Sequence, residues 1–271
     1  MLGIVRTRPP LAALLFLLSA CAKSDERFAQ ELGDRDPFVR ALAAIALAEQ
    51  APDRTELLAR ALPVLLETVD RSELGLQAPA AAALARTGGR LAPALLDALA
   101  RGEFMTLERR AAVLDALAAA GEPAIPAVLD AMRGPDLDRR RELGLVLARI
   151  GAPSVRPLVR VLAEDPDASM RGAAALILGE IGAPARNAIA ALVGALERDE
   201  GGVALAAAHA LPRIDAGGTA VIPALEAARA RSEPAVREAA AAGIARIQAA
   251  RAASLRGQPD GDPRNRRGPE K

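Results

Sequence analysis

Cysteine, histidine and aromatic residues are nearly absent from this sequence of 271 residues. The chain has one cysteine, Cys21, one histidine, His209, and neither tryptophan nor tyrosine. A lone cysteine cannot form an internal disulfide bond, and a lone histidine excludes a metal site built from several histidines. Aromatic residues favour β-sheets, so their scarcity, together with the abundance of alanine and leucine, predicts an all-α protein.

An excess of charge of either sign is also absent. The chain has 35 basic and 34 acidic side chains, and its formal net charge is +1. Proteins that bind nucleic acids mainly through the phosphates usually carry a strong excess of basic residues. We therefore expect no nucleic-acid partner.

The amino terminus has the three parts of a secretory signal peptide. Arg6 and Arg8 precede an apolar run at residues 11–18, and the small residues Ser19 and Ala20 follow it. The run is too short to span a bilayer, which needs roughly 20 apolar residues. We predict that residues 1–20 are a signal peptide, with a buried helix as the alternative.

The sequence Leu18-Ser19-Ala20-Cys21 resembles a bacterial lipobox. The resemblance implies cleavage before Cys21 and attachment of lipid to this residue, whose acyl chains would hold the protein on a membrane. The alternative is an ordinary signal peptide followed by a chance cysteine. Ala22, rather than aspartate, follows the cysteine, which in a Gram-negative host implies the outer membrane, facing the periplasm. Residues 21–33 are then the lipidated cysteine and a short polar tether.

A repeated unit of two short helices fills most of the remaining chain, and its clearest copy covers residues 167–196. The first helices align at intervals of 30 to 37 residues, on Arg40, Gln77, Arg110, Arg140, Arg171, Ala204 and Arg237. Seven residues later stands a predicted core column of Leu47, Leu84, Leu117, Leu147, Leu178, Leu211 and Ile244. Four residues before the aligned positions stand predicted helix caps at Asp36, Glu73, Thr106, Asp136, Asp167, Glu200 and Glu233.

The second helices align on a column of prolines, which we interpret as helix starts because proline is tolerated in the first turn. The aligned positions are Pro63, Pro93, Pro126, Pro157, Ala190 and Pro223. Two residues later stands the partner core column of Leu65, Leu95, Val128, Val159, Leu192 and Leu225. The predicted turns between the helices contain Gly88-Gly89, Gly121, Gly151, Gly182 and Gly217-Gly218.

Two regions depart from the pattern. In the sixth repeat, Gly201, Gly202 and Pro212 disfavour a helix, which predicts a kink or looser packing. At the carboxyl end, residues 249–255 extend the seventh first helix. Residues 257–271 are polar and rich in proline and glycine, which predicts a disordered tail.

Three motifs carry a resemblance to a known repeat family. They are Asp36-Pro37-Phe38-Val39-Arg40, Glu233-Pro234-Ala235-Val236-Arg237 and Leu178-Gly179-Glu180-Ile181-Gly182. They resemble the HEAT repeat, in the short form found in phycobilisome lyases, over residues 34–256. The resemblance implies an α-α superhelix of six to seven helical pairs. It also implies that the acid and arginine columns bond between neighbouring first helices, with interruptions at Gln77 and Ala204.

The sequence contains no recognisable catalytic, metal or cofactor site, and we expect no enzymatic activity. His209 lies away from the Leu211 face of its helix, which favours a structural or solvated role. The repeated His-Glu metal ligands of HEAT-like hydroxylases are absent. Phycobilin lyases are harder to exclude because their catalytic residues are not held in one short motif. Export argues against their cytoplasmic substrate.

The outward positions of the second helices are the candidate binding surface. In HEAT solenoids these helices line the concave side, and here the first three carry Glu67, Asp97 and Asp130. A merely solvated acidic face is one interpretation. The functional hypothesis is a scaffold that binds a basic or extended segment of another envelope protein. A lyase-like or chaperone-like factor acting on a protein-bound ligand, and a passive spacer, are the alternatives.

Overall fold

The computed structural model describes residues 24–102, 106–215, 217–231 and 233–256. Within these ranges the chain is helical and contains no strand, which confirms the all-α class. The chain divides into two compact units, Met1–Asp130 and Ala131–Lys271. The predicted signal peptide at 1–20, Cys21 and the predicted tail at 257–271 lie outside the described residues.

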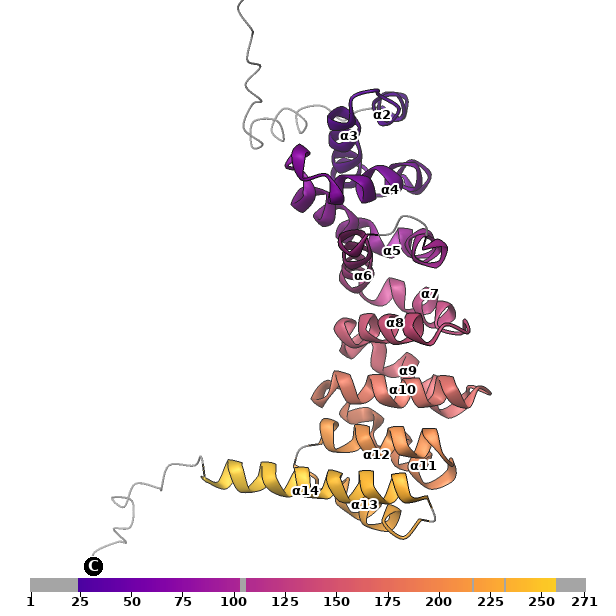
Figure 1. Cartoon of the computed structure of the whole chain (residues 1–271), viewed down its shortest axis with the longest axis vertical. Coiled ribbons are helices and arrows are strands. Elements are labelled where there is room, and N and C mark those ends of the chain that lie inside the picture. Colours follow the sequence, from indigo (N-terminus) through magenta and orange to yellow (C-terminus); the bar gives the residue numbers. More distant parts are fainter. Residues whose placement is uncertain (1–23, 103–105, 216, 232, 257–271) are drawn as a thin grey trace, which may run out of the picture. The chain divides into compact units, whose positions relative to one another are not determined.

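The first unit is a succession of α-helices, with short 3₁₀ turns after α4 and after α6 (Figure 1). They are α2 (Asp25–Leu32), α3 (Pro37–Gln50), α4 (Thr55–Asp70), η1 (Ser72–Leu74), α5 (Gln77–Arg101), α6 (Leu107–Ala120), η2 (Glu122–Ala124) and α7 (Ile125–Ala131), whose last residue belongs to the second unit. Helix α3 packs against α4 and α5, and α5 packs against α4 and α6.

The second unit continues the same helical order. Its elements are α8 (Leu137–Ile150), α9 (Ala152–Glu164), α10 (Ala168–Ile181), η3 (Ala183–Ala188), α11 (Ile189–Arg198), α12 (Gly202–Ile214), α13 (Ile222–Ala228) and α14 (Pro234–Arg256). Helices α8, α10, α12 and α14 lie side by side in one layer (Figure 1), and α9, α11 and α13 pack against that layer. This two-layer stack is the expected α-solenoid arrangement.

The core column of the first helices is confirmed at every position. The six leucines are fully buried, and Ile244 is 8% exposed. The partner column is buried at five of six positions. The exception is Val159, which is half-buried, because in α9 the neighbouring Leu158 takes the core position instead.

The proline column marks helix starts in only two copies. Pro126 and Pro223 lie in the first turn of α7 and α13, as predicted. Pro63, Pro93 and Pro157 instead lie inside α4, α5 and α9, so the prediction is wrong there.

Helix α4 shows why an internal proline is accommodated. Its buried stripe begins before Pro63, with Leu58, Ala61 and Leu62, and continues through Leu65. Burial of this stripe on both sides of the proline offsets the free-energy cost of the hydrogen bond that the proline cannot make.

Gly88 and Gly89 do not form the predicted turn, because they lie inside the 25-residue helix α5. Gly88 is a site of close packing. A Cβ atom at this position would collide with the main-chain carbonyl oxygen of Ala116 in α6. The other predicted turns are confirmed: Gly121, Gly151 and Gly182 follow α6, α8 and α10, and Gly218 lies between α12 and α13, all four with positive φ.

The sixth repeat is packed tightly, contrary to the expectation from its glycines and proline. Helix α12 runs unbroken through Pro212, and Ala204, Ala207 and Leu211 are fully buried. A Cβ atom at Gly179 of α10 would lie 2.8 Å from the Cα atom of Ala210. Small residues here bring two helices together, and Gly201 and Gly202 do not interrupt the helix because they lie at its start.

Residues 25–32 are not part of a polar tether, because they form helix α2 with Ser24 as its N-cap. Phe28 and Leu32, four residues apart, are buried, and α2 packs against α3 and α4. Arg54 lies over the ring of Phe28, 5.9 Å from its centroid, and also pairs with Asp25. The folded part therefore begins directly after Ser24.

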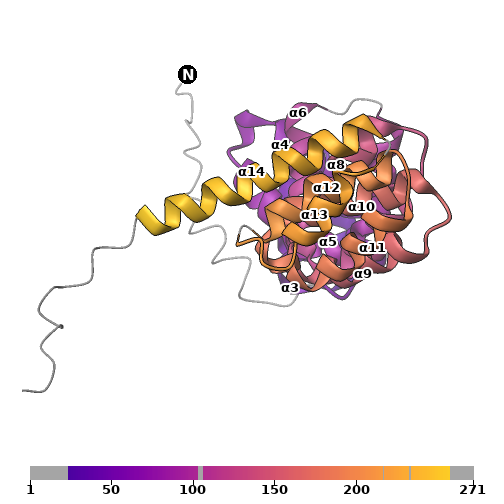
Figure 2. The same ribbon diagram turned by 90° about the horizontal axis from the view of Figure 1, so that it is seen from below.

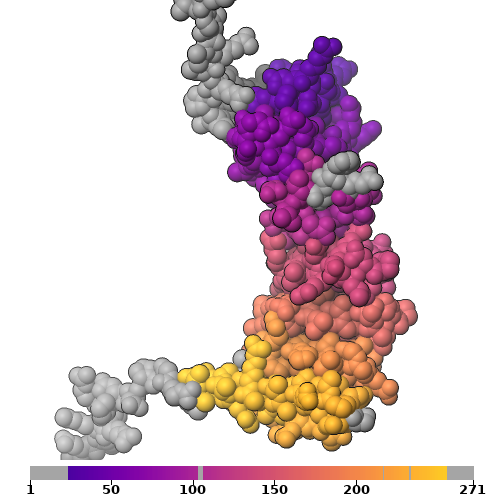
Figure 3. Space-filling view, in the orientation of Figure 1, coloured from indigo at the N-terminus to yellow at the C-terminus, as the bar shows by residue number. Residues whose placement is uncertain are grey.

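Helix α14 includes residues 249–255, as the sequence predicts. Its carboxyl-terminal end projects beyond α12 and α13 in Figures 1 and 2. The space-filling view in Figure 3 shows the same yellow end extending from the second unit.

Two leucines of α10 test the packing. Leu178 is fully buried, whereas Leu176 on the same helix is 51% exposed. We predict that Leu178→Ala lowers the free energy of unfolding by about 2–5 kcal/mol, because it leaves a cavity between packed helices. The matched control Leu176→Ala should cost less than about 1 kcal/mol. Urea unfolding followed by circular dichroism measures both, and equal costs would mean that the core column is misassigned.

Candidate functional site

The three acidic residues predicted to bind a partner lie on separate helices of the first unit. Glu67 on α4 is half-buried and pairs with Arg71 at 2.9 Å and Arg40 at 3.9 Å. Asp97 on α5 is exposed and pairs with Arg101 at 2.7 Å.

Asp130 on α7 is also exposed. Among the described residues, no hydrogen bond or ion pair joins it to Glu67 or Asp97. Exposed ion pairs such as that of Asp97 contribute little stability, so Asp97 can exchange its pair for one with a partner. Asp130 is accessible to a partner because it is exposed. Glu67 is partly engaged within the fold.

His209 is exposed on α12, in agreement with the solvated role expected from the sequence. The described residues contain no group of three or more side chains that could hold a metal ion. No single helix among them is long and apolar enough to cross a membrane, and one pair, Leu107–Ala120 with Glu122–Ala131, passes that test only jointly, with a bend of 112°.

The aligned arginines bind the loop that precedes their own helix. Four of them donate to the carbonyl oxygen six residues earlier, at distances of 2.9–3.1 Å: Arg40 to Asp34, Arg140 to Gly134, Arg171 to Asp165 and Arg237 to Arg231. The arginine column thus fixes the connection between consecutive repeats.

Two of these arginines also reach the following repeat. Arg140 donates to the hydroxyl of Ser169 at 2.7 Å, and Arg171 donates to the carboxylate of Asp199 at 2.7 Å. The predicted bonding between neighbouring repeats therefore exists at these positions, but the acceptors are not the acids of the aligned column.

The residues of the acidic column cap four of the first helices. Asp36, Thr106, Asp136 and Asp167 each accept a hydrogen bond from a main-chain amide in the first turn of α3, α6, α8 and α10. Glu73 does not cap α5, because it lies in the 3₁₀ turn η1, and Glu200 does not cap α12, whose N-cap is Gly201.

A second set of charge pairs, at the carboxyl ends of the first helices, was missed by sequence reasoning. Glu49 pairs with Arg86 at 3.0 Å, and Glu180 pairs with Arg213 at 2.6 Å. In each pair the two residues stand nine positions after the aligned residue of consecutive repeats. The repeat spacing was therefore a signal that could have revealed them.

Asp165 and Arg231 hold the loops of the second unit. The Arg133 guanidinium donates to Asp165 at 2.7 Å and holds the pKa of that carboxyl below its ordinary value of 3.8. Arg231 donates to the carbonyl oxygens of Leu196 and Asp199, and its hydrogen bonds with Glu233 raise the pKa of the guanidinium. The contacts of both groups therefore stabilise loops of the fold.

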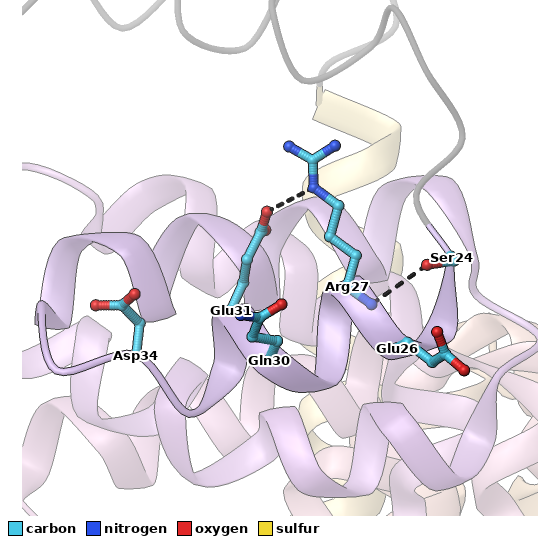
Figure 4. Close-up of a pocket in the computed structure, with 6 residues that line it drawn as sticks. All are labelled: Ser24, Glu26, Arg27, Gln30, Glu31 and Asp34. Atoms are coloured by element: carbon cyan, nitrogen blue, oxygen red, sulfur yellow. Dashed lines mark hydrogen bonds and ion pairs between the residues drawn. The ribbon is translucent and has the colours of Figure 1, made fainter.

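Among the described residues of the first unit, the surface is hollowed at the three following places, among others. The smallest, about 470 Å³, follows one side of α2, where Arg27 donates to Glu31 at 3.0 Å and the Ser24 hydroxyl accepts from the Arg27 amide (Figure 4). A second, about 720 Å³, lies between α5 and α6 and contains Arg86 and Arg90. The third, about 760 Å³, lies between the amino-terminal parts of the same two helices.

Comparison with known protein families decides the nature of the repeats in the second half of the chain. Residues 125–212 and 156–245 match the HEAT repeat family. This part of the chain is therefore similar to HEAT repeats. The matched residues begin in α7 and extend into α14, and they contain the members of the arginine and leucine columns that lie in the second half of the chain.

Among solved structures, the chain is similar to human deoxyhypusine hydroxylase in complex with glycerol. The identity is 20%, the match covers 88% of this chain and 89% of that chain, and the TM-score is 0.39. No curated protein matches the chain.

The expectation that the chain is not an enzyme is contradicted by this comparison, because the similar structure is that of an enzyme. We therefore withdraw it. The expectation rested on the absence of a recognisable catalytic motif. A helical repeat stack can carry catalytic side chains on its surface without a short motif in the sequence. A likeness of this degree assigns no reaction and no residue to the chain.

The Asp165–Arg133 pair predicts a defined pH dependence of stability. Because folding lowers the pKa of Asp165, the carboxylate contributes stability above about pH 4, and this contribution is lost as the pH falls through the lowered value. Asp165→Asn should therefore cost about 1 kcal/mol at pH 7, and the difference from the wild type should shrink toward pH 3. Arg133→Gln should have the same effect. Unfolding curves at both pH values measure it, and a difference that grows on acidification would refute this assignment.

Proposed function

We propose that the protein is a bacterial lipoprotein that works as a HEAT-repeat interaction scaffold in the cell envelope. The observation that carries the scaffold is the match to HEAT repeats over residues 125–245. In such a stack the buried core columns stabilise the fold, so outward positions on successive helices can be used for binding. The partner would be another envelope protein.

The anchor is proposed from the sequence Leu18-Ser19-Ala20-Cys21, with lipid on Cys21. Helix α2 begins at Asp25, so only residues 22–24 separate the lipidated residue from the packed fold. Three extended residues reach about 10 Å, which would hold the first unit close to the membrane surface. In a Gram-negative host, Ala22 directs the lipoprotein to the outer membrane, facing the periplasm.

The proposed binding surface consists of Glu67, Asp97 and Asp130. Asp97 and Asp130 offer exposed carboxylates, while Glu67 is shared with Arg71 and Arg40. Carboxylates on successive second helices suit a basic, extended segment of the partner, whose positive side chains would pair with them. Asp97 and Asp130 are expected to contribute more binding free energy than Glu67. Their carboxylates are exposed, whereas Glu67 would have to give up its ion pairs with Arg71 and Arg40.

The anchor is tested by replacing the cysteine. Cys21→Ala should abolish incorporation of labelled palmitate and processing by the lipoprotein signal peptidase, because the acceptor thiol is gone. The protein should then leave the detergent-extractable membrane fraction. Ser19→Ala, which keeps small residues before the cysteine, is the matched control and should be labelled as in the wild type. Normal palmitate labelling of Cys21→Ala would reject the lipoprotein assignment.

A further inference from the structure

The third hollow, about 760 Å³ in volume, lies between two first helices of the first unit. We call it the α5–α6 groove. It is lined by Val69, Asp70, Ser72, Gln77, Ala78, Ala81, Thr106, Glu108, Ala111, Ala112 and Asp115. Its floor is made largely of alanine, and its polar groups come from the carboxyl end of α4, from η1, from the start of α5 and from α6 with its N-cap, including Asp115 in the middle of α6. It shares no residue with Glu67, Asp97 and Asp130.

The corresponding place in the second unit is filled by arginine. Between α8 and α10, the guanidinium of Arg140 makes three hydrogen bonds: to the carbonyl oxygen of Met132 at 2.8 Å, to that of Gly134 at 3.1 Å and to the hydroxyl of Ser169 at 2.7 Å. One guanidinium thus joins the first helix of one repeat to the start of the next.

The aligned residue in α5 is Gln77. Its side chain is shorter than arginine and neutral, and among the described residues it makes no hydrogen bond. It is half-buried and lines the groove. The guanidinium that Arg140 supplies in α8 is therefore missing at the aligned position of α5.

The acceptor for that guanidinium is present and carries a charge. Ser169, which receives Arg140, stands two residues before Arg171, and the aligned residue two before Arg110 is Glu108. Glu108 is exposed and lines the groove. Asp70 is already used, since it pairs with Arg109 at 2.5 Å and accepts from the Thr106 hydroxyl at 2.6 Å.

We infer that the α5–α6 groove receives an arginine side chain from a partner protein. The guanidinium takes the place that the chain's own arginine occupies between α8 and α10, with Glu108 and the side-chain oxygen of Gln77 as acceptors. The alanine floor accommodates the aliphatic part of the side chain. Arginine is favoured over lysine because its planar group can donate to both acceptors at once.

This inference rests on the interaction role proposed above, but not on the lipid anchor or the acidic surface. It is tested on the full-length protein in detergent, by fluorescence anisotropy of the labelled peptide Gly-Ala-Arg-Ala-Ala-Arg-Ala-Gly. The citrulline counterpart of the peptide keeps the shape and removes the charge. We expect the arginine peptide to bind and the citrulline peptide to bind at least about tenfold more weakly.

Gln77→Arg fills the groove from within and should weaken peptide binding by about fivefold to tenfold, while the unfolding temperature stays equal or rises. Gln248→Arg makes the same exchange at an exposed position of α14 and should leave binding unchanged. Glu108→Gln, a second variant with no added bulk, should also weaken binding.

Equal binding of the two peptides, absence of binding, or wild-type affinity of Gln77→Arg and Glu108→Gln would each overturn the inference. Asp97→Lys with Asp130→Lys separates it from the proposed acidic surface. Loss of binding only in this double variant would place the peptide on the acidic surface and refute the groove. Wild-type binding by the double variant supports the groove.

Discussion

Burial of each helix against the next repeat is the constraint on which the rest of the structure depends. No first helix can cover its apolar stripe alone, so the leucine column is buried only because consecutive helices approach closely. Two close approaches between helices use glycine and alanine, at Gly88 against Ala116 and at Gly179 against Ala210. The alanine-rich composition is thus a packing requirement, and the few aromatic residues follow from it, because large rings would separate the helices.

The same constraint determines where binding surfaces can lie. The columns of leucine, capping residues and arginine stabilise the fold, since four of the aligned arginines fix the loop before their helix. Polar groups available to a partner therefore lie at two kinds of position. The first are outward residues of the second helices, such as Asp97 and Asp130, and the second are places where the usual residue of a column is replaced by another. Gln77 is of the second kind, because it stands in the arginine column and lines the groove between α5 and α6.

The sequence predicted the features that depend on periodicity. The seven-residue offset to Leu178 and its equivalents predicted the core, and the acid before each helix predicted most caps. It failed where one residue type serves two physical purposes. Gly88 indicates a turn by propensity but serves close packing, Pro63 indicates a helix start but lies within α4, and Phe28 lay in a segment too polar on average to predict α2. The α5–α6 groove was not predictable, because only the structure shows what an arginine at position 77 would contact.

The central claim is that the repeats, rather than the anchor alone, recruit partners at the membrane. Proximity labelling in cells tests it most directly, with a biotin ligase fused after Lys271 and an anchor-only control that fuses residues 1–24 to the same ligase. The account predicts a small, reproducible set of labelled envelope proteins that the control lacks. This set should shrink for Asp97→Lys with Asp130→Lys, but not for Glu226→Lys with Glu238→Lys, which are also exposed. Labelling identical to that of the anchor-only control would contradict the account and leave a passive spacer.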